Sequence, residues 1–468
     1  MHTARRSLQS QATVLVALAL LTARGGDAQG PVFATLYSFK GGSDGASPNA
    51  VTLGKNGALY GTTYTGGSNT CGLNVAYLCG TVFELAHVSG GWTKTVLHSF
   101  NGADGELPSP NQFFPGAPGA SLGFGSKGAL YGTTAAGGSY GSSGLGSSGG
   151  TVFELAPPAT AGGVWTETVL YSFSNSFDAP HTPFGGVFIG QSGAVYGTTF
   201  SSQYVSGGGG FEVGGAVFAL KPPSSPGGSW TERTLFNLWP DGAAGMYPTA
   251  GLVSAGGSFY GTTSISDGLG GCGSVYEVSP PTASGGAWTG TAIYEFEAGG
   301  SCNSDAPVTV GPGGVLYGTT YNGGSGTVCI TGCGTVFQLT PPAVAGGAWT
   351  EAVIYSFTGT NGDGASPAAG VTLGKNGVLY GSTTYGGSAT AGCHNPFTGA
   401  NGCGTVFELT PPATPGGAWT ETILHTFTGP NGDGSLPGPL TVSRVGVLYG
   451  PTLTGGTAGK GTIFAIQP

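Results

Sequence analysis

Residues 33–39 read FATLYSF, and this short stretch decides how the whole chain folds. It matches the second half of a longer phrase that reads WTETVLYSF at residues 165–173. The longer phrase occurs six times, beginning at Trp92, Trp165, Trp230, Trp288, Trp349 and Trp419. Two other phrases of the chain occur seven times each, so residues 33–39 supply the half copy that the last repeat lacks.

These two phrases define the repeat. One ends in YGTT or a close variant and carries Tyr60, Tyr131, Tyr196, Tyr260, Tyr317, Tyr380 and Tyr449. The other is close to GTVFEL and begins at Gly80, Gly150, Gly215, Gly273, Gly334, Gly404 and Gly461. The tyrosines recur about every 65 residues, which is long for a solenoid turn and suits a propeller blade with extended loops.

Each repeat contains four segments rich in β-branched and aromatic residues, separated by clusters of Gly, Pro, Asn or Asp. In the sixth repeat we assign strands A, B, C and D to residues 370–373, 378–383, 404–409 and 419–427. Side chains alternate between the two faces of a strand. Along strand D, the even-numbered residues from Thr422 to Thr426 should therefore point to one face, and the odd-numbered residues from Ile423 to Phe427 to the other.

The half copy at the start of the chain favours a closed ring. An open solenoid exposes its end repeats and carries atypical capping units there. In a ring, the first strand completes the final sheet and covers an edge that would otherwise invite aggregation. We therefore predict an all-β fold, a seven-bladed β-propeller of four-stranded antiparallel sheets, closed by the N-terminal strand joining the last blade. Residues 29–468 should form this single domain.

The composition agrees with this fold. The chain has 96 Gly and 31 Pro, and charged residues make up 7% of it, which excludes the solvated surface of a helical protein. Intrinsic disorder is excluded because the glycines recur at fixed places in the repeat. We expect the Gly after each repeated Tyr to let neighbouring sheets approach each other. The repeated Tyr and Trp residues should pack in the core.

Residues 1–28 have the three parts of a secretory signal peptide. Arg5 and Arg6 precede an apolar run at 12–21, and the small residues Gly26 and Ala28 mark a cleavage site. The apolar run is too short to cross a bilayer. We expect a secreted, extracellular and monomeric protein without a transmembrane segment. Its formal net charge of −9 disfavours nucleic acid as a partner, because phosphate binding needs clustered Lys and Arg.

Eight cysteines in an exported chain indicate disulfide bonds. Spacing alone leaves the connectivity open, but pairing between sequence neighbours is the economical arrangement: Cys71 with Cys79, Cys272 with Cys302, Cys329 with Cys333, and Cys393 with Cys403. Zinc is the alternative for Cys329 and Cys333. It is disfavoured because no second ligand pair with His lies nearby in the sequence.

In a propeller, the B to C loops and the D to A loops share one face. The B to C loops vary from 8 to 20 residues, whereas the A to B loops are short and alike. Variable loops on a rigid scaffold usually carry binding functions, so we call this side the variable face. All eight cysteines fall on it. So does one Asp in each D to A loop: Asp44, Asp104, Asp178, Asp241, Asp305, Asp363 and Asp433.

Two interpretations fit these aspartates. An Asp that precedes Gly commonly caps its own turn by accepting backbone N–H groups. A ring of seven carboxylates could instead bind calcium or a cationic ligand. Calcium needs six to eight oxygens, and residues 361–364 supply only two suitable side chains, so turn capping is favoured. We expect no other metal and no organic cofactor.

Catalytic signatures are few. Residues 137–141 match G-x-S-x-G, but in a Gly-Ser loop without the strand-to-helix turn that exposes the nucleophile. Residues 459–462 resemble a phosphate-binding loop, but Gly461 stands where Ser or Thr is required. Acidic residues that recur in most repeats indicate a structural role. The acids on the variable face that no other repeat shares are Glu106, Glu212, Asp267 and Glu297, and these are the catalytic candidates.

The three phrases together resemble the GloVer tandem-repeat family of exported bacterial proteins, over residues 31–468. The resemblance implies an exported repeat protein. Members often carry one of several anchoring or sorting segments at the C-terminus. It implies no catalytic residues. This chain stops at Gln467 and Pro468, without an apolar tail or a basic end, so we expect free release rather than attachment to the cell surface.

Three functions remain open from the sequence. The first is the binding of extracellular glycans or protein partners through the variable face. The second is a polysaccharide hydrolase or lyase that uses carboxylates near the mouth of the channel. The third is a structural component of the envelope or matrix. The thin catalytic signatures favour binding over catalysis.

Overall fold

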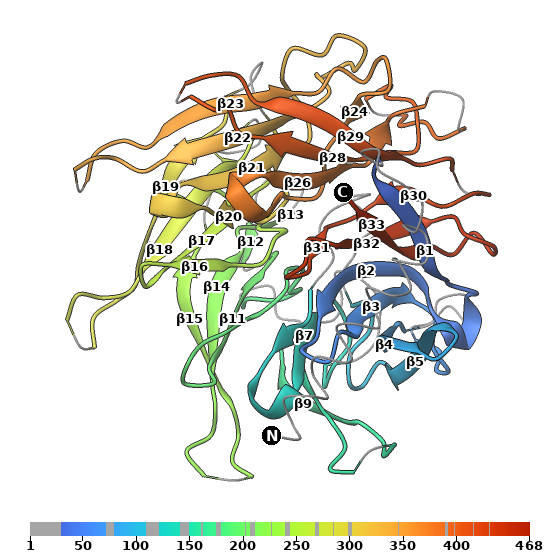
Figure 1. Ribbon diagram of the computed structural model, residues 1–468. Coiled ribbons are helices and arrows are strands. Elements are labelled where there is room, and N and C mark those ends of the chain that lie inside the picture. Colours follow the sequence, from blue (N-terminus) through green and yellow to red (C-terminus); the bar gives the residue numbers. More distant parts are fainter. Residues whose placement is uncertain are drawn as a thin grey trace, which may run out of the picture.

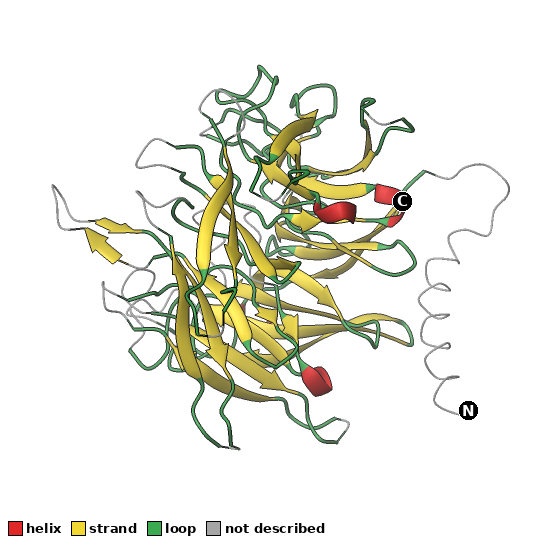
Figure 2. Cartoon of the chain, turned by 90° about the vertical axis from the view of Figure 1, so that its left-hand side faces the viewer, coloured by secondary structure: helices red, strands yellow, loops and turns green. Residues whose placement is uncertain are grey.

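The computed structural model describes most of the chain after the N-terminal segment (Figure 1). The described residues are 30–71, 79–108, 121–140, 149–160, 162–174, 179–201, 203–205, 211–225, 227–238, 244–266, 271–283, 285–297, 302–344, 346–388, 392–396, 398–414, 416–429 and 431–468. The predicted signal peptide lies outside them. Strands dominate the described residues (Figure 2). The helical pieces are single turns, η1 (Gly42–Asp44), η2 (Ser126–Gly128), η4 (Pro312–Gly314) and η5 (Lys375–Gly377). None of the described helices has the length and hydropathy needed to cross a bilayer.

Seven antiparallel sheets form the blades of a propeller, as predicted (Figure 1). The first three are β2 (Ala46–Leu53), β3 (Leu59–Thr65), β4 (Thr81–Val88), β5 (Gly91–Ser99); β6 (Gly123–Phe124), β7 (Leu130–Thr134), β8 (Thr151–Ala156), β9 (Thr166–Ser172); and β10 (Phe188–Ile189), β11 (Val195–Thr199), β14 (Ala216–Lys221), β15 (Thr231–Asn237).

Blades four to six have the same order of strands. They are β16 (Val253–Ala255), β17 (Ser258–Thr263), β18 (Ser274–Ser279), β19 (Thr289–Glu295); β20 (Thr309–Val310), β21 (Leu316–Thr320), β22 (Thr335–Thr340), β23 (Thr350–Ser356); and β25 (Thr372–Leu373), β26 (Leu379–Thr383), β28 (Thr405–Thr410), β29 (Thr420–Thr426). Two small sheets accompany the blades: β12 (Gln203–Val205) with β13 (Phe211–Val213), and β24 (Gly364–Ala365) with β27 (Tyr385–Gly386).

The seventh blade contains the two ends of the described chain. It is built from β30 (Ser435–Pro437), β31 (Thr441–Val442), β32 (Leu448–Thr454), β33 (Thr462–Gln467) and β1 (Val32–Ser38). Strand β1 runs antiparallel to β33 and pairs Val32 with Gln467 and Ser38 with Thr462. Figure 1 shows the blue N-terminal strand beside the red C-terminal strands. The predicted closure of the ring by residues 33–39 is confirmed.

The repeated YGTT phrase lies on the second strand of each blade, and its Gly has a different role from the one expected. Gly61 pairs with Phe83 on the next strand of the same blade. A Cβ at Gly61 would lie 2.8 Å from Phe83 Cζ, so the ring of Phe83 fills the space that a side chain would take. The expectation that this Gly lets neighbouring sheets meet is wrong, because the close contact is between two strands of one sheet.

The two threonines of YGTT have separate hydrogen bonds. In blade two, Thr133 donates from Oγ1 to the carbonyl of Gly185, which belongs to the entry of blade three, at 3.0 Å. Thr134 instead pairs with Thr151 of the next strand in its own blade, with 2.8 Å between their Oγ1 atoms. Both threonines are buried, so these bonds satisfy hydroxyls that would otherwise be costly inside the protein.

The outermost strand of each blade carries a β-bulge, which the predicted alternation of strand D did not include. In β29, Ile423 pairs with Phe407 and His425 pairs with Val406, so Leu424 is the extra residue. Leu424 is buried, although the alternation placed it on the same face as the exposed Thr422. The prediction of strict alternation across residues 422–427 is therefore wrong. An extra residue in one strand moves the side chains of the residues that follow it to the opposite face of the sheet.

Aromatic pairs join neighbouring blades. The Phe that ends the WTETVLYSF phrase packs against the Phe of GTVFEL in the next blade, with ring centroids 5.1 to 5.3 Å apart. The pairs are Phe39–Phe83, Phe100–Phe153, Phe173–Phe218, Phe296–Phe337, Phe357–Phe407 and Phe427–Phe464. At the remaining interface, Leu238 and Tyr276 share one core cluster. The hydrophobic core is thus a series of clusters between blades.

Removal of residues 31–39 should strongly destabilise the protein, because β33 would lose one of its two pairing partners and the core around Phe39 would open. We expect a lower unfolding temperature in calorimetry, and partial recovery when a synthetic peptide of residues 31–39 is added. An unchanged unfolding temperature for the truncated protein would contradict the role of β1 in closing the ring.

Phe357→Ala should cost about 3–5 kcal/mol, as expected for truncation of a fully buried aromatic side chain. Val344, which is 72% exposed, provides the control, since Val344→Ala should change stability by less than about 0.5 kcal/mol. Chemical denaturation of both variants measures the difference. Equal effects of the two substitutions would argue against the interblade core described above.

Candidate binding site on the variable face

The loops that enter each blade lie over the loops that follow its second strand. Seven equivalent pairings connect the two: Ala46 with Thr65, Glu106 with Ala136, His181 with Ser201, Met246 with Ile265, Cys302 with Asn322, Ala365 with Tyr385, and Ser435 with Thr454. The D to A and B to C loops therefore share one face, as the topology requires. This variable face is where the candidate sites must be sought.

The residue after each of these pairings has a positive φ and forms a backbone bond to the preceding blade. In Leu107, for example, φ is 53° and the N–H donates to the carbonyl of Cys79 at 3.0 Å. The same bond joins Ser47 to Lys460, Thr182 to Gly149, Tyr247 to Gly214, Asn303 to Cys272, Ser366 to Cys333 and Leu436 to Cys403. We call this bond the interblade clamp. It connects each D to A loop to the residue that precedes strand C of the previous blade.

The four disulfide bonds have the pairing that was expected from sequence neighbours. They join Cys71 to Cys79, Cys272 to Cys302, Cys329 to Cys333, and Cys393 to Cys403. One cysteine of each pair also accepts an interblade clamp through its carbonyl: Cys79, Cys272, Cys333 and Cys403. The disulfides thus restrain the variable loops at the points where consecutive blades are joined.

Four of the loop aspartates have the hydrogen bonds expected of turn capping. Each accepts the N–H of a residue near the end of the preceding outer strand: Lys40 for Asp44, Asn101 for Asp104, Thr358 for Asp363 and Thr428 for Asp433. Asp305 differs, because it follows the clamp residue Asn303, is buried, and accepts the hydroxyl of Ser264 at 2.6 Å. Asp178 and Asp241 lie outside the described residues.

The two catalytic candidates that the structure describes, Glu106 and Glu297, lie apart from each other. Glu106 is buried at the interface of blades one and two, whereas Glu297 is exposed after β19 in blade four. Glu212 lies on β13, of whose side chains nothing is described, and Asp267 lies outside the described residues. The two described candidates belong to different interfaces and do not form a carboxylate pair.

The structure instead brings together residues that recur in the repeat. The Tyr of WTETVLYSF, or the residue in its place, meets the residue that follows Trp-Thr on the outer strand of the next blade, often beside a loop Asp. We call each such group a rim cluster. The facing residues are Tyr37 with Lys94, His98 with Glu167, Tyr171 with Glu232, Phe236 with Gly290, Tyr294 with Glu351, Tyr355 with Glu421, and His425 with Phe33.

Three rim clusters replace the Tyr–Glu pair, each with a different contact. Lys94 forms an ion pair with Asp44 at 3.0 Å. Gly290 leaves room for the ring of Phe236, because a Cβ there would lie 2.5 Å from Phe236 Cε1. Phe33 stacks on the ring of His425, with centroids 3.7 Å apart. Sequence reasoning missed these groups, since it treated the recurring Glu residues as structural without asking which side chain of the neighbouring repeat they face.

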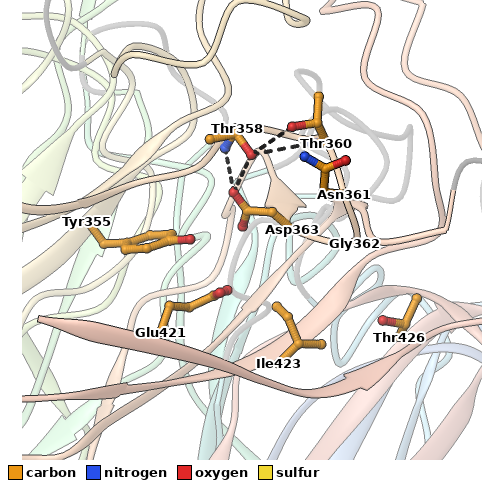
Figure 3. A pocket seen from close by; sticks show the side chains of 9 residues that line it. All are labelled: Tyr355, Thr358, Thr360, Asn361, Gly362, Asp363, Glu421, Ile423 and Thr426. Carbon is orange, nitrogen blue, oxygen red and sulfur yellow. Dashed lines mark hydrogen bonds between the residues drawn. The ribbon is translucent and has the colours of Figure 1, made fainter.

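The rim cluster between blades five and six opens into a pocket of about 490 Å³ (Figure 3). Figure 3 shows the hydroxyl of Tyr355 and the carboxylates of Asp363 and Glu421 pointing toward one another. Asp363 is held by the N–H and the hydroxyl of Thr358, both at 2.7 Å. The remaining lining residues are Thr360, Asn361, Gly362, Ile423 and Thr426. The pocket is therefore polar, with one aromatic wall.

Burial, neighbouring charge and hydrogen bonds shift the pKa values of carboxylates in the rim clusters. Burial, followed by the charge of Asp363, raises the pKa of Glu421 to about 7, although the hydrogen bond from Tyr355 opposes the shift. The equivalent Glu167 also has its pKa raised to about 7, mainly by burial. At Asp433, burial alone would raise the pKa, but hydrogen bonds from His425 and Thr428 hold it below its ordinary value.

Glu421 should make the protein less stable as the pH rises. The pKa of Glu421 is higher in the folded state, about 7, than the value of 4.5 expected in the unfolded state. The contribution of Glu421 to the free energy of unfolding is therefore complete below about pH 4.5 and is lost as the pH rises to about 7. Among the described residues, the titratable groups that face it are Tyr355 and Asp363. Thermal unfolding at pH 5 and pH 7.5 measures the loss, about 1 kcal/mol after solvent screening.

Glu421→Gln provides the matched variant, since glutamine stays neutral at both pH values. The difference in stability between pH 5 and pH 7.5 should be smaller in this variant than in the native protein. The same pH dependence in both proteins would show that Glu421 keeps an ordinary pKa.

Comparison with known proteins identifies a family. No curated protein matches the sequence. Similar solved structures include the PQQ-bound aldose sugar dehydrogenase of Streptomyces coelicolor, with 11% identity, a TM-score of 0.45, and coverage of 95% of this chain and 99% of that chain. A Dyadobacter fermentans protein of unknown function has 12% identity, a TM-score of 0.40, and coverage of 94% and 99%.

PhoX of Pseudomonas fluorescens, in complex with vanadate, has 10% identity, a TM-score of 0.41, and coverage of 94% of this chain and 95% of that chain. These TM-scores are all below 0.5, and we draw no functional conclusion from these structures. The model of the Gloeobacter/Verrucomicrobia repeat, in contrast, matches residues 117–395, which is more than half of the 468 residues. With its seven repeats folded as seven blades, the chain belongs to the Gloeobacter/Verrucomicrobia repeat family.

Proposed function

We propose that this protein is exported and binds extracellular glycans through its variable face, with the pocket between blades five and six as the binding site. The observation that carries the proposal is the lining of this pocket. Two carboxylates, an amide and several hydroxyls face a space of about 490 Å³ beside the ring of Tyr355. Ligand pockets combine an apolar wall with a few polar groups that fix the orientation of the ligand.

A sugar ring suits both parts of this lining. Its hydroxyl groups can donate to Asp363 and Glu421 and can bond to Asn361 and Thr360, while its C–H face can lie against the ring of Tyr355. Hydrogen bonds to charged groups are also stronger than those between neutral groups. A neutral polyhydroxylated ligand would therefore gain specificity from the carboxylates without the repulsion that an anionic ligand would meet.

Export is supported by the secretory pattern of residues 1–28 and by the four disulfide bonds, which persist in oxidising compartments. The loops beside the pocket also expose apolar side chains, with Val328 and Ile330 exposed by 47% and 78%. These residues flank Cys329, whose disulfide to Cys333 restrains the loop. A restrained loop that exposes apolar groups next to a polar pocket is suited to recognition.

A hydrolase or lyase is the second candidate, and one observation favours it. Asp363 and Glu421 are two carboxylates in one pocket, and the pKa of Glu421 is raised to about 7, as for a general acid. Against catalysis stands the recurrence of this arrangement. His98, Asp104 and Glu167 occupy the equivalent positions between blades one and two, and a contact that joins neighbouring blades would account for both groups.

A glycan array followed by calorimetric titration with the best ligand tests the proposal. We expect specific binding that falls by about tenfold or more in Glu421→Gln and Thr360→Ala, because each removes a hydrogen bond worth about 1–2 kcal/mol. Glu167→Gln is the matched control, since it makes the same change at another rim cluster and should leave glycan binding intact.

Other outcomes separate the alternatives. Release of reducing sugar from a bound polysaccharide, lost in Glu421→Gln, would replace the binding proposal with the hydrolase. Absence of binding to every glycan would overturn the proposal and leave a protein partner or a purely structural role. Equal losses in Glu421→Gln and Glu167→Gln would show that the change acts through stability and not at the pocket.

A further inference from the structure

The rim cluster between blades one and two has a composition that none of the other six shares. The repeated Tyr is replaced by His in two repeats only, at His98 and His425. His425 is faced by the ring of Phe33, whereas His98 is faced by Glu167. An imidazole, a loop aspartate and a facing glutamate thus come together at this one interface of the seven.

The three side chains point to one small region. His98 Nε2, one carboxylate oxygen of Asp104 and one of Glu167 all lie within 4.8 Å of one another. The first two are 3.1 Å apart. They come from three separate elements: β5, the loop that follows it, and β9 of the next blade. The side chains of His98 and Asp104 remain 20% and 12% exposed, which leaves an approach from solvent.

A second observation points to a ligand at this place. Glu167 Oε1 is completely buried and accepts no hydrogen bond from the described residues. A buried carboxylate oxygen without a donor is costly, and native proteins seldom leave one unpaired. A cation held by His98 and Asp104 would lie beside the carboxylate of Glu167 that carries this oxygen.

The neighbouring contacts hold the other two groups in place. Asp104 Oδ1 accepts the N–H of Asn101 at 2.8 Å, so its Oδ2 is directed to His98. The ring of His98 meets the edge of Phe100, with centroids 4.9 Å apart. Contacts of this kind, which orient the ligands from outside, are typical of metal sites in proteins.

We propose that His98, Asp104 and Glu167 form a site for a divalent transition-metal ion, of which zinc is the first candidate. One imidazole and two carboxylates suit zinc, whereas calcium prefers an all-oxygen set of six to eight ligands. Zinc lies about 2.0–2.2 Å from such ligands and prefers tetrahedral geometry, in which two ligand atoms are about 3.4 Å apart. The widest separation, within 4.8 Å, would therefore have to close by up to about 1.4 Å.

The ion would connect blade one to blade two and keep at least one coordination position for water. This position makes the site different from a closed structural zinc site, which has four protein ligands. Within the described parts of the chain, this is the one interface whose two blades are joined through such a set. The further site is independent of the glycan pocket, which lies between blades five and six.

Titration of the chelator-treated protein with zinc chloride, followed by calorimetry, tests the site. We expect one ion per chain, with affinity about 100-fold lower in His98→Tyr and in Glu167→Gln, since changes even outside the first ligands cost about 10–100-fold. His98→Tyr introduces the residue that other repeats have at the equivalent position, for example Tyr171 and Tyr355, so this variant should fold. Glu421→Gln is the control and should bind zinc as the native protein does.

Two further measurements complete the test. Cobalt(II) in place of zinc should give visible absorption bands in the native protein and in Glu421→Gln, but not in Glu167→Gln. Zinc should also raise the unfolding temperature of the native protein, because an ion that binds only the folded state stabilises it. Absence of zinc binding in the native protein, or binding in both His98→Tyr and Glu167→Gln that is as tight as in the native protein, would overturn the proposal. The latter result would assign the ion to exposed histidines such as His394.

Discussion

The interblade clamp is the interaction on which the rest of the structure depends. It places a residue other than glycine at a positive φ in seven equivalent positions, from 53° at Leu107 to 60° at Asn303. L-residues avoid this conformation, so each clamp stores strain that the surrounding contacts must offset. In six of the seven, proline follows and limits the alternatives of the chain. The strain is accepted because each bond fixes the position of one blade relative to the next.

The clamp also explains where variation is tolerated. It joins each D to A loop to the end of the B to C loop of the preceding blade, so that the loops can differ in length while the clamp fixes the position of one blade relative to the next. The disulfides follow the same logic, because four clamp carbonyls belong to cysteines. The rim clusters show that composition can vary as well. An ion pair, a ring over a glycine and a stacked imidazole occupy equivalent positions, provided that the two facing residues fit each other.

Much of the fold could be predicted from the sequence, because the information was local or repeated. The number of blades, the four strands of each and the closure by residues 33–39 follow from phrases and spacings. The disulfides agree with the pairing of sequence neighbours, which spacing favoured without proving. The bulge at Leu424 could not be seen, since its seven copies look like ordinary strand residues. The rim clusters were also missed. His98 and Glu167 lie in different repeats, and no pattern within one repeat states which residues of two blades face each other.

The pairing of β1 with β33 has a consequence for the order of folding. The two strands stand at opposite ends of the described chain, so their contact has the greatest sequence separation in the molecule. The earliest strand to be synthesised must stay without its partner until the final one exists. Until then the sheet of the last blade has an open edge, which is a template for pairing with another molecule. Folding of such a chain is slow, and it benefits from protection against contact with other molecules. The chain is most prone to aggregate just before the last strand pairs.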